Sequence, residues 1–256
     1  MPLQQLLEQT VAFVELELRR LRHDPTEVFT RAVQPVLWLT VFGITMEKLR
    51  AIPAGSVNYI TYISPGVVLQ SASFIALAYG IMLVWERESG ILKKLVASPV
   101  DRLIIVLGRS MAGAVRALTQ LFIVLAVALL IGARLSLDPL NVFFATVVLV
   151  VGCAGLTSLS IILAVFMKTR ERFMGILQAI SMPLFFTSNA LYPVDIMPAP
   201  IKAIAQVNPL TYIISSLRDA LVFGDIMSGL TGLLVTLVFT TIMVALATAF
   251  LQKIVE

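Results

Sequence analysis

The chain has 256 residues, of which 59% are hydrophobic and 13% are charged, with a formal net charge of +4. Soluble domains are about half apolar and a quarter charged, so this composition leaves little of the chain for an aqueous domain and indicates a polytopic membrane protein. A single cysteine and a single histidine exclude an intrachain disulfide and a Cys–His metal cluster.

Residues 1–24 predict an amphipathic helix. Apolar residues recur at steps of three and four between Leu3 and Leu21, and polar residues occupy the rest of the helical wheel. Pro25 ends the pattern because proline restricts the residue before it. Arginines near the end of this segment favour a helix that lies along the cytoplasmic membrane surface.

Residues 25–256 contain six apolar stretches, most of which approach the roughly 20 residues that a helix needs to cross a hydrocarbon core of about 30 Å. They are Val33–Met46, Ile63–Trp85, Ala114–Ile131, Val142–Met167, Met174–Leu191 and Leu230–Leu251. The first is short and needs flanking residues to complete it. We therefore expect an all-α membrane protein with six transmembrane helices.

Lysine and arginine residues concentrate on alternate connections between these stretches. Of the 19 in the chain, only five fall on the other set, namely Lys48, Arg50, Arg134, Lys202 and Arg218. The positive-inside rule then predicts both termini in the cytoplasm of a prokaryotic cell that carries the chain in its inner or plasma membrane. The positive net charge reflects this topology, and we predict no nucleic-acid partner. Arg109 and Arg116, before the apolar part of the third stretch, are expected to snorkel to the inner interface.

Residues 85–103, between the second and third stretches, predict a short charged helix. Apolar residues share one face of it, Lys93 and Lys94 occupy the other, and Ser98-Pro99 ends it. Such a helix, tied to two membrane helices, suits a docking element. The alternative is a solvated loop whose charges only set the topology.

Residues 192–216, between the fifth and sixth stretches, are too long for a tight turn and too rich in proline for one helix. They are also too apolar for an exposed loop, and irregular backbone at membrane depth survives only against protein or water. We predict two short helices that dip into the outer leaflet and break near Asn208-Pro209. A helical hairpin lying flat on the surface is the alternative.

The sequence lacks the motifs of catalysis. No Gly-Lys pair occurs, so a Walker-type phosphate loop is absent and this chain is not itself an ATPase. The only histidine, His23, lies in the N-terminal segment, away from any serine in a membrane stretch. We expect no enzyme activity, bound cofactor, catalytic residue or metal in this chain.

Two motifs complete a resemblance to a known family. Glu-Arg-Glu-Ser-Gly-Ile-Leu-Lys-Lys-Leu follows the second stretch, and Asn-Pro-Leu-Thr-Tyr at residues 208–212 precedes the sixth. With the N-terminal helix, they resemble the membrane subunits of type-2 ATP-binding-cassette exporters of the daunorubicin-resistance and nodulation-factor kind. The resemblance covers nearly the whole chain. One departure is Lys93-Lys94, where many relatives carry an acidic residue.

The resemblance implies a half-transporter that dimerises, with a homodimer expected and a heterodimer left open. It also implies two copies of a separately encoded ATPase, which would bind ATP and magnesium. Residues 1–24 match the connecting helix of the family and residues 192–216 its re-entrant helices. The coupling-helix residues would be Glu86, Arg87, Glu88, Gly90, Leu92, Lys93, Leu95 and Pro99.

The expected function is ATP-driven export of an amphipathic, lipid-linked or drug-like substrate between two copies of the chain, near the first, second and fifth stretches. Candidate path residues are Gln70, Phe74, Tyr79, Phe185, Phe186 and Asn189. Helix packing or lipid contact is the competing explanation for each. The two copies are expected to meet through bulky residues that include Val36, Phe42, Phe173 and Leu177. A channel or a non-transporting scaffold is the alternative, since neither needs a coupling helix.

Overall fold

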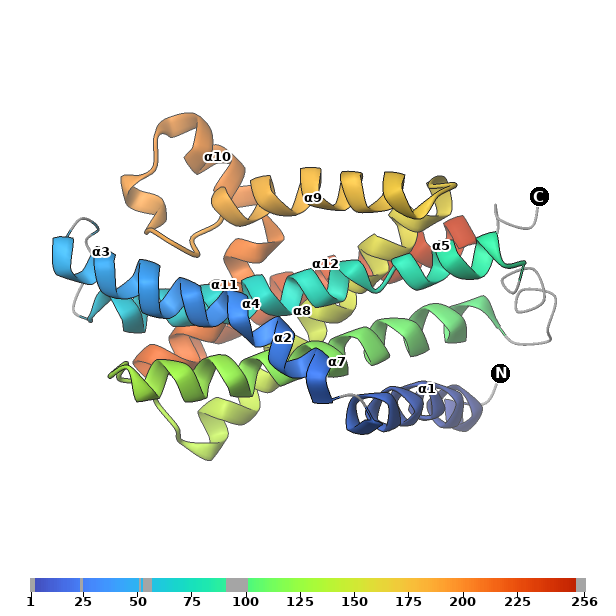
Figure 1. Ribbon diagram of the computed structural model, residues 1–256, viewed down its shortest axis with the longest axis horizontal. Coiled ribbons are helices and arrows are strands. Elements are labelled where there is room, and N and C mark those ends of the chain that lie inside the picture. Colours follow the sequence, from blue (N-terminus) through green and yellow to red (C-terminus); the bar gives the residue numbers. More distant parts are fainter. Residues whose placement is uncertain (1–2, 24, 51, 53–56, 91–100, 252–256) are drawn as a thin grey trace.

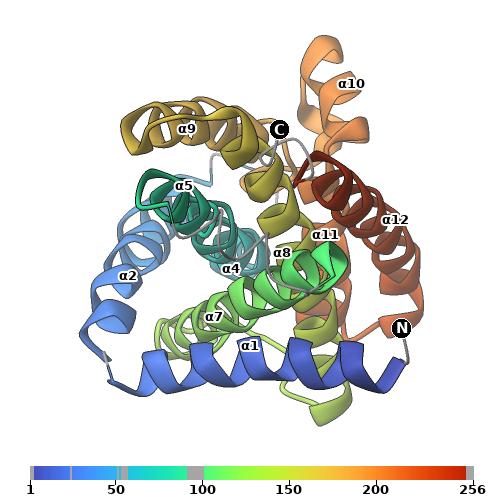
Figure 2. The same ribbon diagram turned by 90° about the vertical axis from the view of Figure 1, so that its right-hand side faces the viewer.

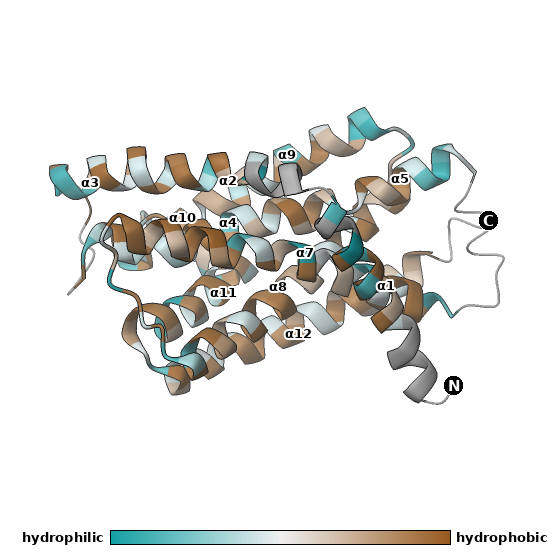
Figure 3. Cartoon of the chain, turned by 60° about the horizontal axis from the view of Figure 1, so that its bottom comes forward, coloured by the Kyte–Doolittle hydropathy of each residue, from teal (hydrophilic) through white to brown (hydrophobic). Residues whose placement is uncertain are grey.

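The computed structural model describes residues 3–23, 25–50, 52, 57–90 and 101–251 (Figure 1). Every regular element in these ranges is helical, which confirms the all-α prediction. Most of the helices run along the long axis of the molecule, with hydrophobic residues along their length and hydrophilic residues mainly toward the two ends (Figure 3). This distribution suits a bundle whose middle lies in hydrocarbon.

The N-terminal helix α1, Leu3–His23, ends where the sequence predicts. It lies crosswise to the bundle, against α7 (Figure 2). The face that packs on α7 carries Phe13, whose ring lies where a Cβ at Gly108 would be. Val11 and Leu18, from the predicted apolar stripe, are exposed. These two residues face away from the protein, and the placement of α1 on a membrane surface stays a prediction.

The first apolar stretch forms one helical run built of α2 (Pro25–Leu37), a π-helical turn η1 (Trp38–Gly43) and α3 (Ile44–Leu49). The run extends beyond the stretch on both sides, which supplies the residues that its short apolar part needs. It ends at Arg50, which adopts a left-handed conformation with φ 50°. In Figure 1 this run lies alongside the bundle.

The second stretch forms α4 (Tyr59–Ala78) and α5 (Ile81–Glu88), which are separated by a break at Tyr79-Gly80. Ser160 of α8 inserts its hydroxyl there. The hydroxyl donates to the Leu77 carbonyl and accepts from the Gly80 amide at 3.0 Å, so it satisfies backbone groups that the helix itself would otherwise pair. Insertion of a side chain into the ladder is a known cause of helix bending.

The long helices α7 (Arg102–Leu130) and α8 (Pro139–Phe166) begin at Asp101 and Asp138, whose carboxylates accept the amides of the second helical residues. The last helix is α12 (Ile226–Leu251). Four helices in the described ranges are long and apolar enough to cross a membrane: Tyr59–Glu88, Arg102–Leu130, Pro139–Phe166 and Ile226–Leu251. They support a membrane protein, and they overlap four of the six stretches that the sequence predicts as spans.

The fifth predicted span corresponds to α9 (Arg170–Phe186), whose 17 residues rise about 25 Å and so fall short of a hydrocarbon core of about 30 Å. It ends five residues before the predicted Leu191. The six-span count therefore stays a prediction.

The core is centred on α4, which is buried along nearly its whole length (Figure 2). It packs mainly on α7 and α8, and α12 covers the other side of α8. Of the most apolar part of α12, only 11% is buried within the chain. The large apolar side chains that α12 exposes are therefore available to lipid.

Residues 192–216 form separate short helices, as predicted. A 3-10 turn η2 (Val194–Ile196) leads to α10 (Ala199–Val207), and α11 (Pro209–Arg218) begins after a break at Asn208. A second π-helical turn, η3 (Asp219–Phe223), joins α11 to α12. α11 is buried against α8, α12 and α4, whereas α10 projects from the bundle (Figure 1). Insertion of α10 and α11 into the outer leaflet stays a prediction.

Candidate coupling site and transport path

The predicted coupling segment is described only at its base. Glu86, Arg87 and Glu88 lie on the last turn of α5, and Gly90 follows with a left-handed φ of 73°, which glycine adopts without strain. The other predicted coupling residues, Leu92, Lys93, Leu95 and Pro99, lie outside the described residues.

Glu86 forms a partly buried ion pair with Arg109 of α7. The Oε2 and Nη2 atoms are 2.6 Å apart, and the side chains are 18% and 9% exposed. This corrects the expectation that Arg109 snorkels to the interface. A carboxylate within reach on α5 holds the guanidinium inside the protein, where solvent screens the attraction little.

Arg87 and Glu88 fasten the end of α5 to the connection between α8 and α9. The Arg87 guanidinium donates to the Val165 carbonyl at 2.8 Å, and this carbonyl is one of those that the end of a helix leaves without a partner. Glu88 pairs with Arg170 at the start of α9, with 2.9 Å between Oε2 and Nε. The base of the coupling segment therefore contacts α7, α8 and α9 at once.

A second buried ion pair, between Glu17 and Arg116, holds α1 on α7. Glu17 is 1% exposed, and its Oε1 lies 2.5 Å from Nε of Arg116. Arg116, like Arg109, is thus paired inside the protein. Arg109 and Arg116 are seven residues apart, so they lie on one face of α7 two turns from each other.

Tyr79 extends the Glu17–Arg116 pair to the second stretch. Its hydroxyl donates to Oε2 of Glu17 at 3.2 Å, and it stands at the break between α4 and α5. We predicted Tyr79 as a path residue from its position in the second stretch. The structure instead gives it a buried partner on α1. Glu17 was missed because an acidic residue on the polar side of an amphipathic helix reads as solvated.

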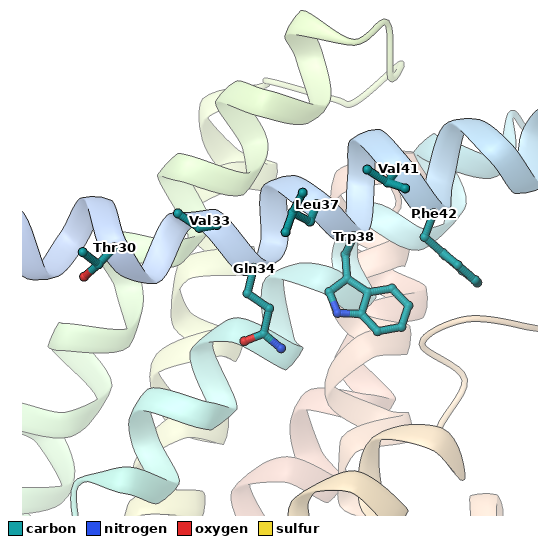
Figure 4. A pocket seen from close by; sticks show the side chains of 7 residues that line it. All are labelled: Thr30, Val33, Gln34, Leu37, Trp38, Val41 and Phe42. Atoms are coloured by element: carbon teal, nitrogen blue, oxygen red, sulfur yellow. The ribbon is translucent and has the colours of Figure 1, made fainter.

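Two adjoining grooves lie on α2 and η1. The larger, of about 630 Å³, is almost wholly apolar, and Gln34, Trp38 and Phe42 project from one side of the helix (Figure 4). It is lined by Thr30, Val33, Gln34, Leu37, Trp38, Val41 and Phe42. The smaller, of about 240 Å³, shares Thr30 and Gln34 with it and reaches α4. It is completed by Arg31, Ser71, Phe74 and Ile75.

The predicted path residues divide around these grooves. Phe74 lines the smaller groove, and the buried Phe185 packs edge-on against Trp38 of the larger one, with ring centres 5.9 Å apart. Phe186 packs on Phe185 and is 44% exposed. Gln70 is buried on α4 and lines neither groove. The groove residues Gln34 and Trp38 were missed, and Phe42 was predicted only as a contact between copies, although the spacing of four between these residues marks one helical face.

Asn189, the remaining path candidate, belongs to a polar cluster at the opposite end of the molecule from the coupling segment. Its side-chain NH₂ group donates to Ser215 Oγ at 2.8 Å, and its backbone carbonyl accepts from Arg218 Nη2 at 2.8 Å. The Arg218 guanidinium also lies 3.9 Å from the centre of the Tyr62 ring. These contacts join α4 and α11 to the segment after α9. Of the six predicted path residues, Phe74 lines a groove and Phe185 packs on the wall of the other, and the role of all six in transport stays a prediction.

The Asn-Pro motif at Asn208 has a structural explanation. Its side-chain oxygen caps α11 by accepting the Leu210 amide at 2.9 Å, and its amide donates to the Leu184 carbonyl at 2.7 Å and to Thr187 Oγ1 at 3.1 Å. One side chain thus starts α11 and fixes it to the end of α9.

Within the described ranges, no three His, Cys, Asp or Glu side chains gather as a metal site.

Comparison with known proteins agrees with this architecture. The family described as ABC-2 type transporter matches residues 8–222. The chain is 28% identical over 215 residues to a protein of Cyanophora paradoxa named as a transport permease, ycf38, with 83% of this chain and 73% of that one covered. It is 25% identical over 232 residues to a protein of Mycobacterium tuberculosis named as the doxorubicin resistance ABC transporter permease DrrC, with 89% and 82% covered.

A third relative is named as the daunorubicin resistance ABC transporter permease DrrB1 of Streptomyces coeruleorubidus. It is 23% identical over 198 residues, which cover 77% of this chain and 69% of that one. The family match runs from α1 through both buried ion pairs and the grooves to η3. The chain described here therefore belongs to the ABC-2 type transporter family and is a membrane permease component of that family.

Proposed function

We propose that this chain is the membrane subunit of an ATP-driven exporter of amphipathic, lipid-linked or drug-like substrates. The observation that carries the proposal is the attachment of two elements to α7, namely α1 through Glu17–Arg116 and α5 through Glu86–Arg109. These are the connecting and coupling elements that would contact an ATPase. A channel or a scaffold would need no such attachment. The names of relatives as drug-resistance permeases favour a drug-like cargo.

The working complex would contain two copies of the chain and two copies of a separately encoded ATPase. ATP and magnesium would bind the ATPase, and this chain would hold neither. Six spans, with the 25–49 run and α9 as the first and fifth, would place both termini in the cytoplasm. No nucleic acid takes part.

The contact between copies needs one revision. Phe173 and Leu177 are each 1% exposed, so they are packed inside a single chain and are not available to a second copy. On α9 the exposed large hydrophobic residues are Met182 and Phe186, at 46% and 44%. We place the contact there, beside the grooves on α2 and η1, so that the substrate path would run between those grooves and the second copy.

Transport in inside-out membrane vesicles would test this function. Vesicles that contain the chain and its cognate ATPase should accumulate a fluorescent anthracycline only when ATP is supplied. The matched control carries an ATPase whose phosphate-loop lysine is replaced by alanine, and it should accumulate none. ATP-independent passage of the dye would favour a channel. A stable complex with no ATP-dependent flux would favour a scaffold.

Docking of the ATPase can be tested separately. Leu92→Asp with Leu95→Asp should abolish copurification of the ATPase, because a leucine seated in an apolar groove contributes roughly 1.5 to 3 kcal/mol. The control is Leu49→Asp with Leu137→Asp, two exposed leucines near connections that the positive-inside rule would place on the other side of the membrane. Equal copurification of both variants would make residues 85–103 a topology loop only.

A further inference from the structure

A third groove, of about 510 Å³, lies where the chain passes from α8 into α9. Its walls combine two basic and several apolar residues. They are Phe166, Met167, Lys168, Arg172, Gly175 and Ile176. This groove is separate from the two grooves on α2 and η1 and shares no residue with them.

The wall that α9 contributes begins with the basic Arg172 and continues with Gly175 and the apolar Ile176. Arg172, Gly175 and Ile176 are spaced by three and four residues and so share one face of that helix. A Cβ at Gly175 would meet no atom within 4 Å, so the space above this face is open. The opposite wall is Phe166, which is 54% exposed and braced by the Phe250 ring of α12 at 5.4 Å.

The basic residues of this groove differ from the neighbouring arginines in their hydrogen-bond and ion-pair partners. Arg87 and Arg170 are engaged by carbonyls of α8 and by Glu88, respectively. Among the described residues, no acidic side chain pairs with Lys168 or Arg172. Glu171 lies between them in sequence, but successive helical positions diverge by about 100°, so it does not share the face of Arg172.

We propose that this groove binds an anionic glycerophospholipid of the cytoplasmic leaflet. The lipid phosphate would lie between Lys168 and Arg172, and one acyl chain would run over Gly175 against Ile176 and Phe166. A phosphate accepts charge-assisted hydrogen bonds from both side chains, and basic pockets between membrane helices on the cytoplasmic side suit anionic headgroups. A water-soluble anion would leave the apolar walls uncovered. The proposal rests on the cytoplasmic placement of this end of the bundle and not on the exported substrate.

Native mass spectrometry of the purified full chain tests the proposal, with dioleoyl phosphatidylglycerol and dioleoyl phosphatidylcholine as probes. The unaltered chain should retain the first lipid and not the second. Lys168→Gln with Arg172→Gln should weaken binding of phosphatidylglycerol about 30-fold, since each basic residue near an anionic surface contributes about five-fold. Lys48→Gln with Arg50→Gln removes the same charge at the opposite end and should leave the affinity unchanged. Equal losses in both double variants would overturn the site.

Gly175→Phe tests the apolar half of the groove without any change of charge. The open space above Gly175 accepts the ring, which would then occupy the path of the acyl chain and reduce phosphatidylglycerol binding at least 10-fold, on the order expected from the lost apolar contact. Unchanged binding of phosphatidylglycerol in this variant would reject the proposed acyl-chain site and show that the lipid is attracted by surface charge alone. A photoreactive phosphatidylglycerol on the unaltered chain gives an independent answer, because the crosslinked peptide must include residues 166–176. Crosslinks confined to other regions would reject the proposal.

Discussion

At the scale of single residues, buried charges explain how α1 and α5 are held on α7. Glu86 and Arg109 are both largely withdrawn from solvent, and the same is true of Glu17 and Arg116. Taking charges out of water is costly, so such a pair adds little net stability compared with apolar residues of similar size. Removal of one partner alone, however, leaves an uncompensated buried charge.

Glu86→Leu should therefore lower the free energy of unfolding by about 3 kcal/mol, and addition of Arg109→Met should restore it to within about 1 kcal/mol. Thermal unfolding of the purified chain in detergent measures both. Glu15→Ala removes the partner of Arg19 in a pair whose side chains are 58% and 72% exposed, and should have a negligible effect. A single Glu86→Leu variant as stable as the unaltered chain would show that the pair is not closed in the membrane.

At the scale of elements, the break between α4 and α5 depends on the close approach of α8. A Cβ at Gly80 would lie 2.7 Å from the backbone carbonyl oxygen of Ser160, and closer still to its hydroxyl. A flexible side chain could move away from such a Cβ, but the backbone of a packed helix cannot do so without repacking. The absence of a side chain at Gly80 thus allows α8 to approach closely enough for Ser160 to hydrogen-bond the backbone at the break between α4 and α5.

Gly80→Ala should overpack this site and lower the free energy of unfolding by roughly 1 to 3 kcal/mol. Thermal unfolding of the purified chain would show this as a lower melting temperature. Addition of Ser160→Gly should not rescue it, because the Cβ would still lie 2.7 Å from the Ser160 carbonyl oxygen and 2.9 Å from the Phe173 ring. The matched control is Gly175→Ala, also in a helix but facing open space, which should be neutral or stabilise by about 0.5 to 1 kcal/mol. Rescue by Ser160→Gly would mean that only the side chain blocks this site.

At the scale of the whole molecule, topology follows from the distribution of basic residues. In a Cys153→Ala background, single cysteines at Lys48, Arg134 and Lys202 should react with an impermeant thiol reagent added to intact cells. A cysteine at Arg19, which is exposed on α1, should react only after the membrane is opened. Labelling of Lys48 and Arg19 from the same side would contradict the six-span topology.

The arrangement of two copies is tested in the same background. Cysteines at Met182 or Phe186, which are exposed on α9, should crosslink to their own copies, because a residue near a two-fold axis meets itself. Cysteines at the buried Phe173 and Leu177 should not. Crosslinking at the buried positions alone would mean that α9 is rotated in the membrane.

The local pattern of the sequence was sufficient for several features. The periodicity of α1, its end before Pro25 and the break at Asn208-Pro209 follow from side-chain spacing and from what proline does to the backbone. The family followed as well, because its two motifs stand at the expected places between apolar stretches. Hydropathy anticipated the membrane helices, since burial in lipid depends on composition over about 20 residues.

Only the tertiary structure decided which partner each polar side chain takes. From the sequence, Arg109 and Arg116 are predicted to lie at the membrane interface and Glu17 to be solvated. In the structure, α1 and α5 pack on α7 and bring these residues into ion pairs, Glu17 with Arg116 and Glu86 with Arg109. Tyr79 and Asn189, which stay predicted path residues, take hydrogen-bond partners on α1 and α11 that their local sequence does not specify. Trp38 and Gln34 line a groove that the sequence did not predict. Periodicity along one helix specifies which face is apolar, but the choice of neighbour depends on long-range contacts, which no local pattern contains.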